Sequence, residues 1–399
     1  MIQGRSHFFA FPHTFHQRDH DRVITELQEA GATGVNLALN YHASRDFLLR
    51  QGPSLEYLAD GFHYYKPDLS QYPIEGIRPE TRDHWPTSDL LNEVLDSAGR
   101  LDFDIAAWGV FLHNGAIGKA RPDATVANAL GNHFLSELCP SNLSVQGYVQ
   151  GLVTDLSSRG VTSIAIESLH FHGARHGEHH ERFFLEMSKT TEFLFSLCFC
   201  SSCMAVFESR DGNAEELKVR VINALQPFLQ DTDPWLNVNL TEDLLNEIVG
   251  ENISAYLRTR EDTVTNFYAI ALEIAHRSGV TLRLVDQSPL LDYSDNYPLD
   301  SSWLVGLDFK RVQNYVDAYE PLIYRLETSH VEEVTRHYQE RIGTKIIPIL
   351  RPTYPDNFSE KGLREKVATL RSLGITDVDF YLLDTMRTRD LNWIKAALT

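Results

Sequence analysis

The chain has 399 residues, of which 43% are apolar and 23% charged, so it can bury a core and is neither disordered nor fibrous. Its 36 basic and 55 acidic residues give a formal charge of −19, which argues against a nucleic-acid partner or an anionic membrane surface. No stretch approaches the roughly 20 apolar residues that span a bilayer. The N-terminus lacks the cationic start and cleavage site of a signal peptide, so we expect a cytoplasmic protein without structural disulfides.

Segments with the apolar patterns of strands and helices alternate along the chain. The expected strands are Ser6–Phe11, Gly34–Tyr41, Phe103–His113, Thr162–Ser168, Val280–Asp286, Pro321–Arg325, Lys345–Arg351 and Asp377–Asp384. The expected helices are Asp19–Ala30, Asp89–Ala98, Val145–Ser158, Glu215–Leu229, Leu244–Ser278, Phe309–Tyr319, His330–Ile342, Ser359–Leu373 and Leu391–Leu398. This alternation predicts an α/β fold, a (β/α)8 TIM barrel.

The order of these units favours a single barrel domain over residues 1–399. An open doubly wound sheet is the alternative, but that fold expects a glycine-rich phosphate turn after the first strand, and Phe11–Thr14 contains no glycine. Long insertions follow the second, third and fourth strands, at about 45–86, 114–144 and 169–279. We expect all three on the C-terminal face of the barrel, where the functional residues of such folds lie.

Polar side chains gather at and after the predicted strand ends. Groups there that could bind sugar hydroxyls are His13, Asn40, His42, Arg45, Asp46, His113, Asn114, His170, His172, His176, Tyr324 and Arg351. Any one of them could instead cap a strand or pair with a neighbour. As a set they predict a substrate-binding ring.

Glu167 ends the fourth strand at a position that alternation turns toward the barrel interior. In Ser163–Glu167 both isoleucines should face the helices, which leaves the serine, the alanine and the glutamate facing inward. On the second strand the same alternation turns Asn40 and His42 inward and Tyr41 outward. A carboxylate at the top of an inward row needs a partner or a catalytic role.

Acid–base cleavage of a glycosidic bond needs a pair of carboxylates. Glu167 is the candidate general acid, and Asp286 and Asp384, at the ends of the fifth and eighth strands, are the candidates for its catalytic partner. We place Asp286 first because the residues after it continue into a loop and not into a helix. Aspartates after strands also cap helices, and the sequence leaves retaining and inverting outcomes open.

The four cysteines of the chain, Cys139, Cys198, Cys200 and Cys203, fit one motif, because the last three form Cys-x-Cys-x-x-Cys. Four thiolates suit a structural zinc ion with tetrahedral ligation and no open position. An iron–sulfur cluster fits the same ligand count, and four unrelated buried thiols are the remaining interpretation. No organic cofactor is expected.

The order of a cysteine after strand three, a glutamate ending strand four and then the cysteine triplet resembles the zinc-binding arrangement of the glycoside hydrolase family 42 β-galactosidases, whose catalytic domain is a TIM barrel. The resemblance covers Cys139 to Cys203 and implies an acid/base role for Glu167 and zinc ligation by the four cysteines. Two departures mark a distant relative. The family's acid/base glutamate follows an asparagine, where this chain has Ile166, and the seventh strand, Lys345–Arg351, lacks the family's nucleophilic glutamate.

Five histidines fall between His170 and His180, shortly after Glu167. Imidazoles suit zinc, manganese or iron, but this spacing matches no established metal motif. We favour a substrate-binding loop whose imidazoles donate to sugar hydroxyls and tune Glu167. A surface cluster without function is the third interpretation.

These patterns predict a glycosidase that acts on an oligosaccharide or a small glycoside. One alternative is a metal-dependent sugar isomerase, epimerase or hydrolase that uses the His170–His180 cluster. The other is a barrel that binds sugar without catalysis. We expect a carbohydrate substrate and no nucleic-acid or membrane partner, and the family resemblance also allows a homo-oligomer.

Overall fold

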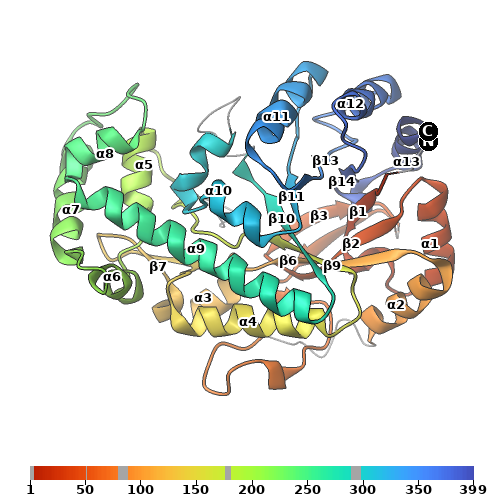
Figure 1. Ribbon diagram of the computed structural model, residues 1–399, viewed down its shortest axis with the longest axis horizontal. Coiled ribbons are helices and arrows are strands. Elements are labelled where there is room, and N and C mark those ends of the chain that lie inside the picture. Colours follow the sequence, from red (N-terminus) through yellow and green to blue (C-terminus); the bar gives the residue numbers. More distant parts are fainter. Residues whose placement is uncertain (1–3, 51, 80–88, 176–180, 289–297) are drawn as a thin grey trace.

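The computed structural model describes residues 4–50, 52–79, 89–175, 181–288 and 298–399. A curved, mostly parallel sheet occupies its centre, and helices lie around the outside (Figure 1). The central strands are β1 (His7–Ala10), β2 (Gly34–Tyr41), β5 (Phe62–His63), β6 (Asp104–Val110), β9 (Ser163–Glu167), β10 (Thr281–Asp286), β11 (Ala318–Pro321), β12 (Lys345–Ile346), β13 (Ile349–Leu350) and β14 (Asp379–Phe380).

The sheet order is β12-β11-β10-β9-β6-β2-β1-β14-β13, and β5 pairs antiparallel with β2. The two ends of this order, β12 and β13, come from one segment, Lys345–Leu350. Pro348 interrupts that segment, since proline has no N–H to donate to a neighbouring strand. An isolated parallel bridge between Leu322 and Ile349 also links the segment after β11 to β13.

The helices are α1 (His20–Glu29), α2 (Leu90–Leu101), α3 (Gly115–Ala120), α4 (Leu143–Ser157), α5 (Lys189–Ser196), α6 (Ser201–Glu208), α7 (Ala214–Gln230), α8 (Glu242–Val249), α9 (Asn252–Arg277), α10 (Phe309–Val312), α11 (Thr328–Arg341), α12 (Glu360–Ser372) and α13 (Thr388–Leu398). Two hairpins stand outside the central sheet, β3 (Ser44–Leu48) with β4 (Ser54–Leu58) and β7 (Thr125–Ala127) with β8 (His133–Leu138). No single helix of the described residues is long and apolar enough to cross a membrane. The pair α5 and α6 meets that criterion only when joined across a 90° bend.

Apolar residues on the two faces of the strands form two separate cores. Ile164 and Ile166 of β9 pack outward in the larger core between sheet and helices. Ala165 packs inward in a smaller, largely aromatic core that includes Phe11 and Trp108. The predicted alternation of β9 is therefore confirmed.

Strand β2 departs from strict alternation. The register shifts between Ala38 and Asn40 where β2 pairs with β6, which is an irregularity of the β-bulge type. Tyr41 consequently joins the inner core and does not face the helices, so its predicted orientation is wrong.

Other predicted boundaries also shift. The sixth strand lies at Ala318–Pro321, ahead of the predicted Pro321–Arg325. The predicted helix Leu244–Ser278 is two helices, α8 and α9, because Gly250 adopts a φ of 87° that ends the first of them.

Buried charges fill the sheet interior on the side where the strands begin. This basal ion cluster consists of Arg5, Asn36, Arg283, Glu320 and Asp379. Arg5 donates to both carboxylate oxygens of Asp379, at 3.1 and 3.0 Å, and Arg283 pairs with Glu320. Asn36 joins the two pairs, because its amide donates to Asp379 at 2.9 Å and its oxygen accepts from Arg283 at 2.7 Å.

Candidate active site and metal centre

Glu167 lies at the C-terminal end of β9, and neutral donors hold both of its carboxylate oxygens. The indole N–H of Trp108, on the adjacent strand β6, donates to Oε2 at 2.6 Å. The side-chain amide of Gln287, just after β10, donates to Oε1 at 2.6 Å. Two neighbouring strands therefore fix this carboxylate at the C-terminal end of the sheet.

Burial raises the pKa of Glu167 above its ordinary value. The hydrogen bonds from Trp108 and Gln287 and the charge of His42 act in the opposite direction but do not cancel this effect. A carboxyl group with a raised pKa stays protonated at higher pH, which is the state that a general acid needs.

Three tyrosines, Tyr41, Tyr324 and Tyr381, lie close enough to Glu167 for its charge to raise their pKa values. The hydroxyls of Tyr41 and Tyr381 lie 3.3 Å apart, and the charge of Glu167 raises the pKa of both, after the larger effect of burial. The guanidinium of Arg351 stacks over the Tyr324 ring at 4.1 Å. Arg351 also forms an ion pair with Asp356 at 2.8 Å.

A cavity of about 420 Å³ opens beside this group. Tyr381 and Arg351 line it together with Asp46 from β3, Trp393 from α13 and the two aromatic residues of the β13–α12 loop, Tyr354 and Phe358. Tyr354 is 76% exposed and Phe358 61% exposed, with their rings 5.7 Å apart. A second cavity of about 460 Å³, lined by residues of α4, α6 and α9, contains none of the predicted site residues.

The other two candidate carboxylates have local partners. Asp286 accepts from the Tyr338 hydroxyl of α11 at 2.6 Å and from the backbone N–H of Ser288 at 2.8 Å. Asp384 accepts from the backbone N–H of Phe11 at 2.7 Å and from the Thr14 hydroxyl at 2.8 Å. Burial raises the pKa of Asp286, and it raises that of Asp384 to about 7. Neither carboxylate hydrogen-bonds to a residue that holds Glu167.

Four of the predicted histidines form a row of rings. The His42 ring stacks on His113 at 4.6 Å, His113 lies 6.0 Å from His172, and His172 lies 4.5 Å from His170. Within this row, Nδ1 of His172 lies 3.8 Å from Oε2 of Glu137 on β8. Glu137 is fully buried, and burial raises its pKa well above the ordinary range, against a smaller lowering by the neighbouring Ser136 hydroxyl.

The remaining predicted residues are spread around the strand ends. His13 lies 5.8 Å from the Tyr64 ring, and burial lowers its pKa to about 4. Asn40 donates to the carbonyl of Val110, Asn114 caps α3, and Arg45 is exposed on β3. His176, His179 and His180 lie outside the described residues.

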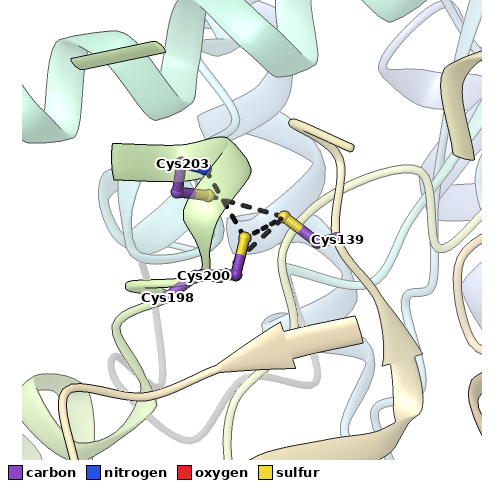
Figure 2. Close-up of side chains that lie close together, drawn as sticks. All are labelled: Cys139, Cys198, Cys200 and Cys203. Atoms are coloured by element: carbon purple, nitrogen blue, oxygen red, sulfur yellow. Dashed lines mark hydrogen bonds between the residues drawn. The ribbon is translucent and has the colours of Figure 1, made fainter. Parts of the chain in front are cut away.

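The four cysteines come together as predicted. Cys139 follows β8, whereas Cys198, Cys200 and Cys203 lie between α5 and α6 and in the first turn of α6 (Figure 2). The Cys139 sulfur is 3.8 Å from that of Cys198 and 3.4 Å from those of Cys200 and Cys203. All four sulfurs lie within 4.8 Å of one another and all four residues are buried.

This geometry suits a metal ion better than a disulfide. A disulfide needs sulfurs about 2.05 Å apart. A tetrahedral zinc with Zn–S bonds of about 2.3 Å places its sulfurs about 3.8 Å apart. Burial and the neighbouring sulfurs raise the pKa of the Cys139 thiol, so thiolates here need a positive partner. Among the described residues, the four cysteines are the group of donors close enough to share an ion, and His170 and His172 do not form a second such group.

Sequence reasoning missed several residues that contact the predicted ones. Trp108 and Gln287 hold Glu167, and Tyr381 pairs with Tyr41. Alternation along β10 could have identified Gln287, because it follows Arg283 and Val285 at every second position and their side chains face inward. No local signal marked Glu137, because its position depends on the fold of the β7–β8 hairpin.

Comparison with protein-family models and with curated proteins finds no match. Solved structures do match. The structure of a catalytic mutant of a GH42 beta-galactosidase from G. stearothermophilus has a TM-score of 0.59 at 10% identity over 100% of this chain and 56% of that one. The beta-galactosidase from the psychrophilic Marinomonas ef1 has a TM-score of 0.57 at 11% identity over 99% of this chain and 59% of that one.

A third match is the alpha-L-fucosidase isoenzyme 2 from Paenibacillus thiaminolyticus, with a TM-score of 0.53 at 10% identity over 100% of this chain and 49% of that one. The chain therefore spans about half to three-fifths of the length of these enzymes. Identities this low show a shared fold. The chain therefore shares its fold with these galactosidase and fucosidase structures.

Proposed function

We propose that the chain is a glycoside hydrolase in which Glu167 is the general acid. The observation that carries the proposal is a buried carboxyl group with a raised pKa, held by two neutral donors, at the strand end where barrel enzymes carry their chemistry. In this role the protonated Glu167 gives its proton to the glycosidic oxygen as the bond breaks. Trp108 and Gln287 position the carboxyl group and stabilise the carboxylate that remains.

Asp46 is our candidate for the second carboxylate. It lines the 420 Å³ cavity, and both it and Glu167 raise the pKa of Tyr41 and Tyr381, so the two carboxylates face the same tyrosine pair. Asp286 and Asp384 remain the alternatives, since neither lines that cavity and their oxygens accept hydrogen bonds from Tyr338 and Thr14, away from the tyrosine pair. We assign the exposed Tyr354 and Phe358 rings to stacking on the apolar face of a sugar.

The architecture that supports this proposal is one closed barrel over residues 1–399, with insertions at about 45–86, 114–144 and 169–279. Two pairings support closure, because β12 pairs with β11 and β13 pairs with β14, while both belong to one segment. The cysteine centre would hold a structural zinc ion between the second and third insertions. Its four thiolates leave no open position for a substrate, so we give it no catalytic step.

The test is substitution of the carboxylates in the full chain with aryl glycosides and oligosaccharides as substrates. Glu167→Gln should lower kcat about 100- to 10,000-fold, the range of general acid catalysis, without loss of fold. Asp46→Asn should lower it comparably, and Asp123→Asn, at a surface pair with Arg121, should not. Full turnover by Glu167→Gln would refute the proposal. A severe loss in Asp286→Asn or Asp384→Asn, but not in Asp46→Asn, would move the second role to that residue.

A barrel that binds sugar without catalysis is the second candidate. It is favoured by one observation, the absence of any carboxylate from Lys345–Leu350, the segment that corresponds to the seventh strand. Isothermal titration with the same glycosides separates the two. Saturable binding with no hydrolysis by wild type supports the binding protein, and hydrolysis excludes it.

A further inference from the structure

Helix α9 packs against the cysteine centre through one face. The Tyr256 hydroxyl donates to the carbonyl oxygen of Cys198, and its ring stacks on Phe199 at 5.2 Å and meets Phe207 edge-on at 5.0 Å. Arg260 lies four residues later, on the same face of the helix. The helix therefore directs a guanidinium toward the region of the four sulfurs.

Arg260 is a buried cation without a carboxylate partner among the described residues. The residue is 4% exposed, and its Nη2 donates to the carbonyl oxygen of Leu304 at 3.0 Å. Its Nε and Nη1 are buried without a hydrogen-bond partner in the described part of the chain. A buried charge left uncompensated costs several kcal/mol, so a group of opposite charge is expected nearby.

The acidic groups that act on Arg260 belong mostly to the cysteine centre and its packing. Burial lowers the pKa of the guanidinium, and Tyr256, Cys203, Cys198 and Glu261 raise it. Glu261, the next residue, does not form an ion pair with it, and its own pKa is raised to about 7, mainly by burial. Neutral thiols would leave the guanidinium without an anion. Four thiolates around a divalent ion carry about two net negative charges and would supply one.

We propose that Arg260 is the built-in counter-charge of a divalent metal–tetrathiolate centre at Cys139, Cys198, Cys200 and Cys203. The inference rests on the proposed metal centre and is independent of the glycosidase reaction. It explains why the helix places an arginine, rather than an apolar residue, in a buried position one turn after Tyr256, whose hydroxyl contacts the Cys198 backbone.

The same guanidinium connects the metal centre to the loop after β9. Arg260 lies over the Phe171 ring at 4.5 Å, and the Phe171 backbone N–H donates to the carbonyl of Val305 at 3.0 Å. Phe171 stands between His170 and His172, the inner end of the histidine row. Arg260 is therefore a positioning residue, which holds the Phe171 loop in place through its own anchoring at the centre.

The first experiment compares two substitutions of Arg260 in the full chain. Arg260→Gln removes the charge but keeps an N–H donor for Leu304, and Arg260→Lys keeps the charge. Arg258→Gln is the matched control on the same helix, because Arg258 is exposed and lies 3.9 Å from Glu242. Zinc affinity is measured by competition with a chromogenic chelator, and folding by circular dichroism. We expect Arg260→Gln to bind zinc about 10- to 100-fold more weakly, the usual effect of an outer-shell partner.

The second experiment reads the charge directly. The purified chain is loaded with iron in place of zinc, and the Fe(III)/Fe(II) potential is measured. The reduced centre carries one more negative charge, so a nearby cation favours it. Arg260→Gln should therefore lower the potential, whereas Arg260→Lys and Arg258→Gln should leave it close to that of wild type.

The outcomes separate the two levels of the proposal. Wild-type protein that binds neither zinc nor iron would refute the metal centre itself. A wild-type centre whose affinity and potential are unchanged in Arg260→Gln would overturn the role of Arg260. Equal shifts in Arg260→Gln and Arg260→Lys would also overturn it, because packing and not charge would then be the cause.

Discussion

The two ends of the sheet interior hold carboxylates in opposite ways. In the basal ion cluster Arg5 and Arg283 neutralise Glu320 and Asp379. For Asp379, burial alone would raise the pKa, but Arg5, His7 and Arg283 lower it below the ordinary value. At the other end Glu167 has a tryptophan and a glutamine as donors, and its pKa is raised. The same curved sheet therefore contains one carboxylate, Asp379, that nearby cations keep charged to lower pH, and one carboxyl group, Glu167, whose pKa burial raises. The pKa of Glu320 is also raised, because burial and the charge of Asp379 outweigh the effect of Arg283 and Arg5.

The comparison teaches that burial alone does not decide the state of a carboxyl group. Asp379 and Glu167 both lie inside the sheet, and burial is the largest influence on the pKa of each. At Asp379 the surrounding cations outweigh burial, since a guanidinium stabilises only the anion, whereas the neutral donors at Glu167 and the close guanidinium at Glu320 do not outweigh it. Cations thus stabilise a buried carboxylate in the basal cluster, and the opposite end is where we propose proton transfer.

The largest expected effect comes from breaking the basal cluster. Arg283→Met leaves Glu320 buried without its closest cation, which should destabilise the fold by about 3–5 kcal/mol. Arg336→Met, which removes an exposed pair with Glu332, should cost no more than about 1 kcal/mol. Denaturant unfolding measures both. A loss in Arg283→Met no greater than in the control would show that the cluster is not a stabilising element.

The next effect concerns the proton on Glu167. Trp108→Phe removes a hydrogen bond that favours the carboxylate, so the pKa of Glu167 should rise further. A general acid works while protonated, and its activity is lost as pH rises through its pKa. The alkaline limb of the kcat profile should therefore move to higher pH.

Gln287→Leu serves as the companion to this test, because Gln287 donates to the other oxygen and its removal should move the limb in the same direction. An alkaline limb that stays in place in both variants would show that Glu167 is not the group that titrates.

The smallest expected effect concerns the cavity beside Tyr381. Tyr354→Ala removes a ring that is 76% exposed, and loss of stacking worth about 0.5–1.5 kcal/mol should raise KM about 2- to 10-fold with little change in kcat. Leu143→Ala, at another exposed apolar side chain outside that cavity, is the control. A KM unchanged from wild type would remove this face of the cavity from the substrate path.

The parts of this arrangement that follow from the spacing of residues within one segment could be predicted from the sequence. The apolar alternation of Ser163–Glu167 placed Glu167 inward, and cysteine spacing gathered the four sulfurs into one cluster. The strand-and-helix alternation also predicted the α/β architecture that the glycosidase structures share.

The rest depends on contacts between distant segments. The irregularity at Ala38 and Asn40, which turns Tyr41 inward, arises where β2 pairs with β6. The sequence could not show that Asp286 is held by Tyr338, because the two residues are 52 positions apart. Its place at a strand end alone made it look like a catalytic carboxylate. Arg260 gave no sequence signal, since its significance depends on four cysteines in two other segments.

The cysteine centre joins Cys139 to a group that begins 59 residues later, at Cys198. A metal ion held there would close the intervening loop and so reduce the freedom of the unfolded chain, as a cross-link does. Thiol reductants cut a disulfide but leave a metal–thiolate link intact, whereas chelators and thiol oxidants remove the metal. The link between the β7–β8 hairpin and the α5–α6 segment would then depend on the concentration of available metal.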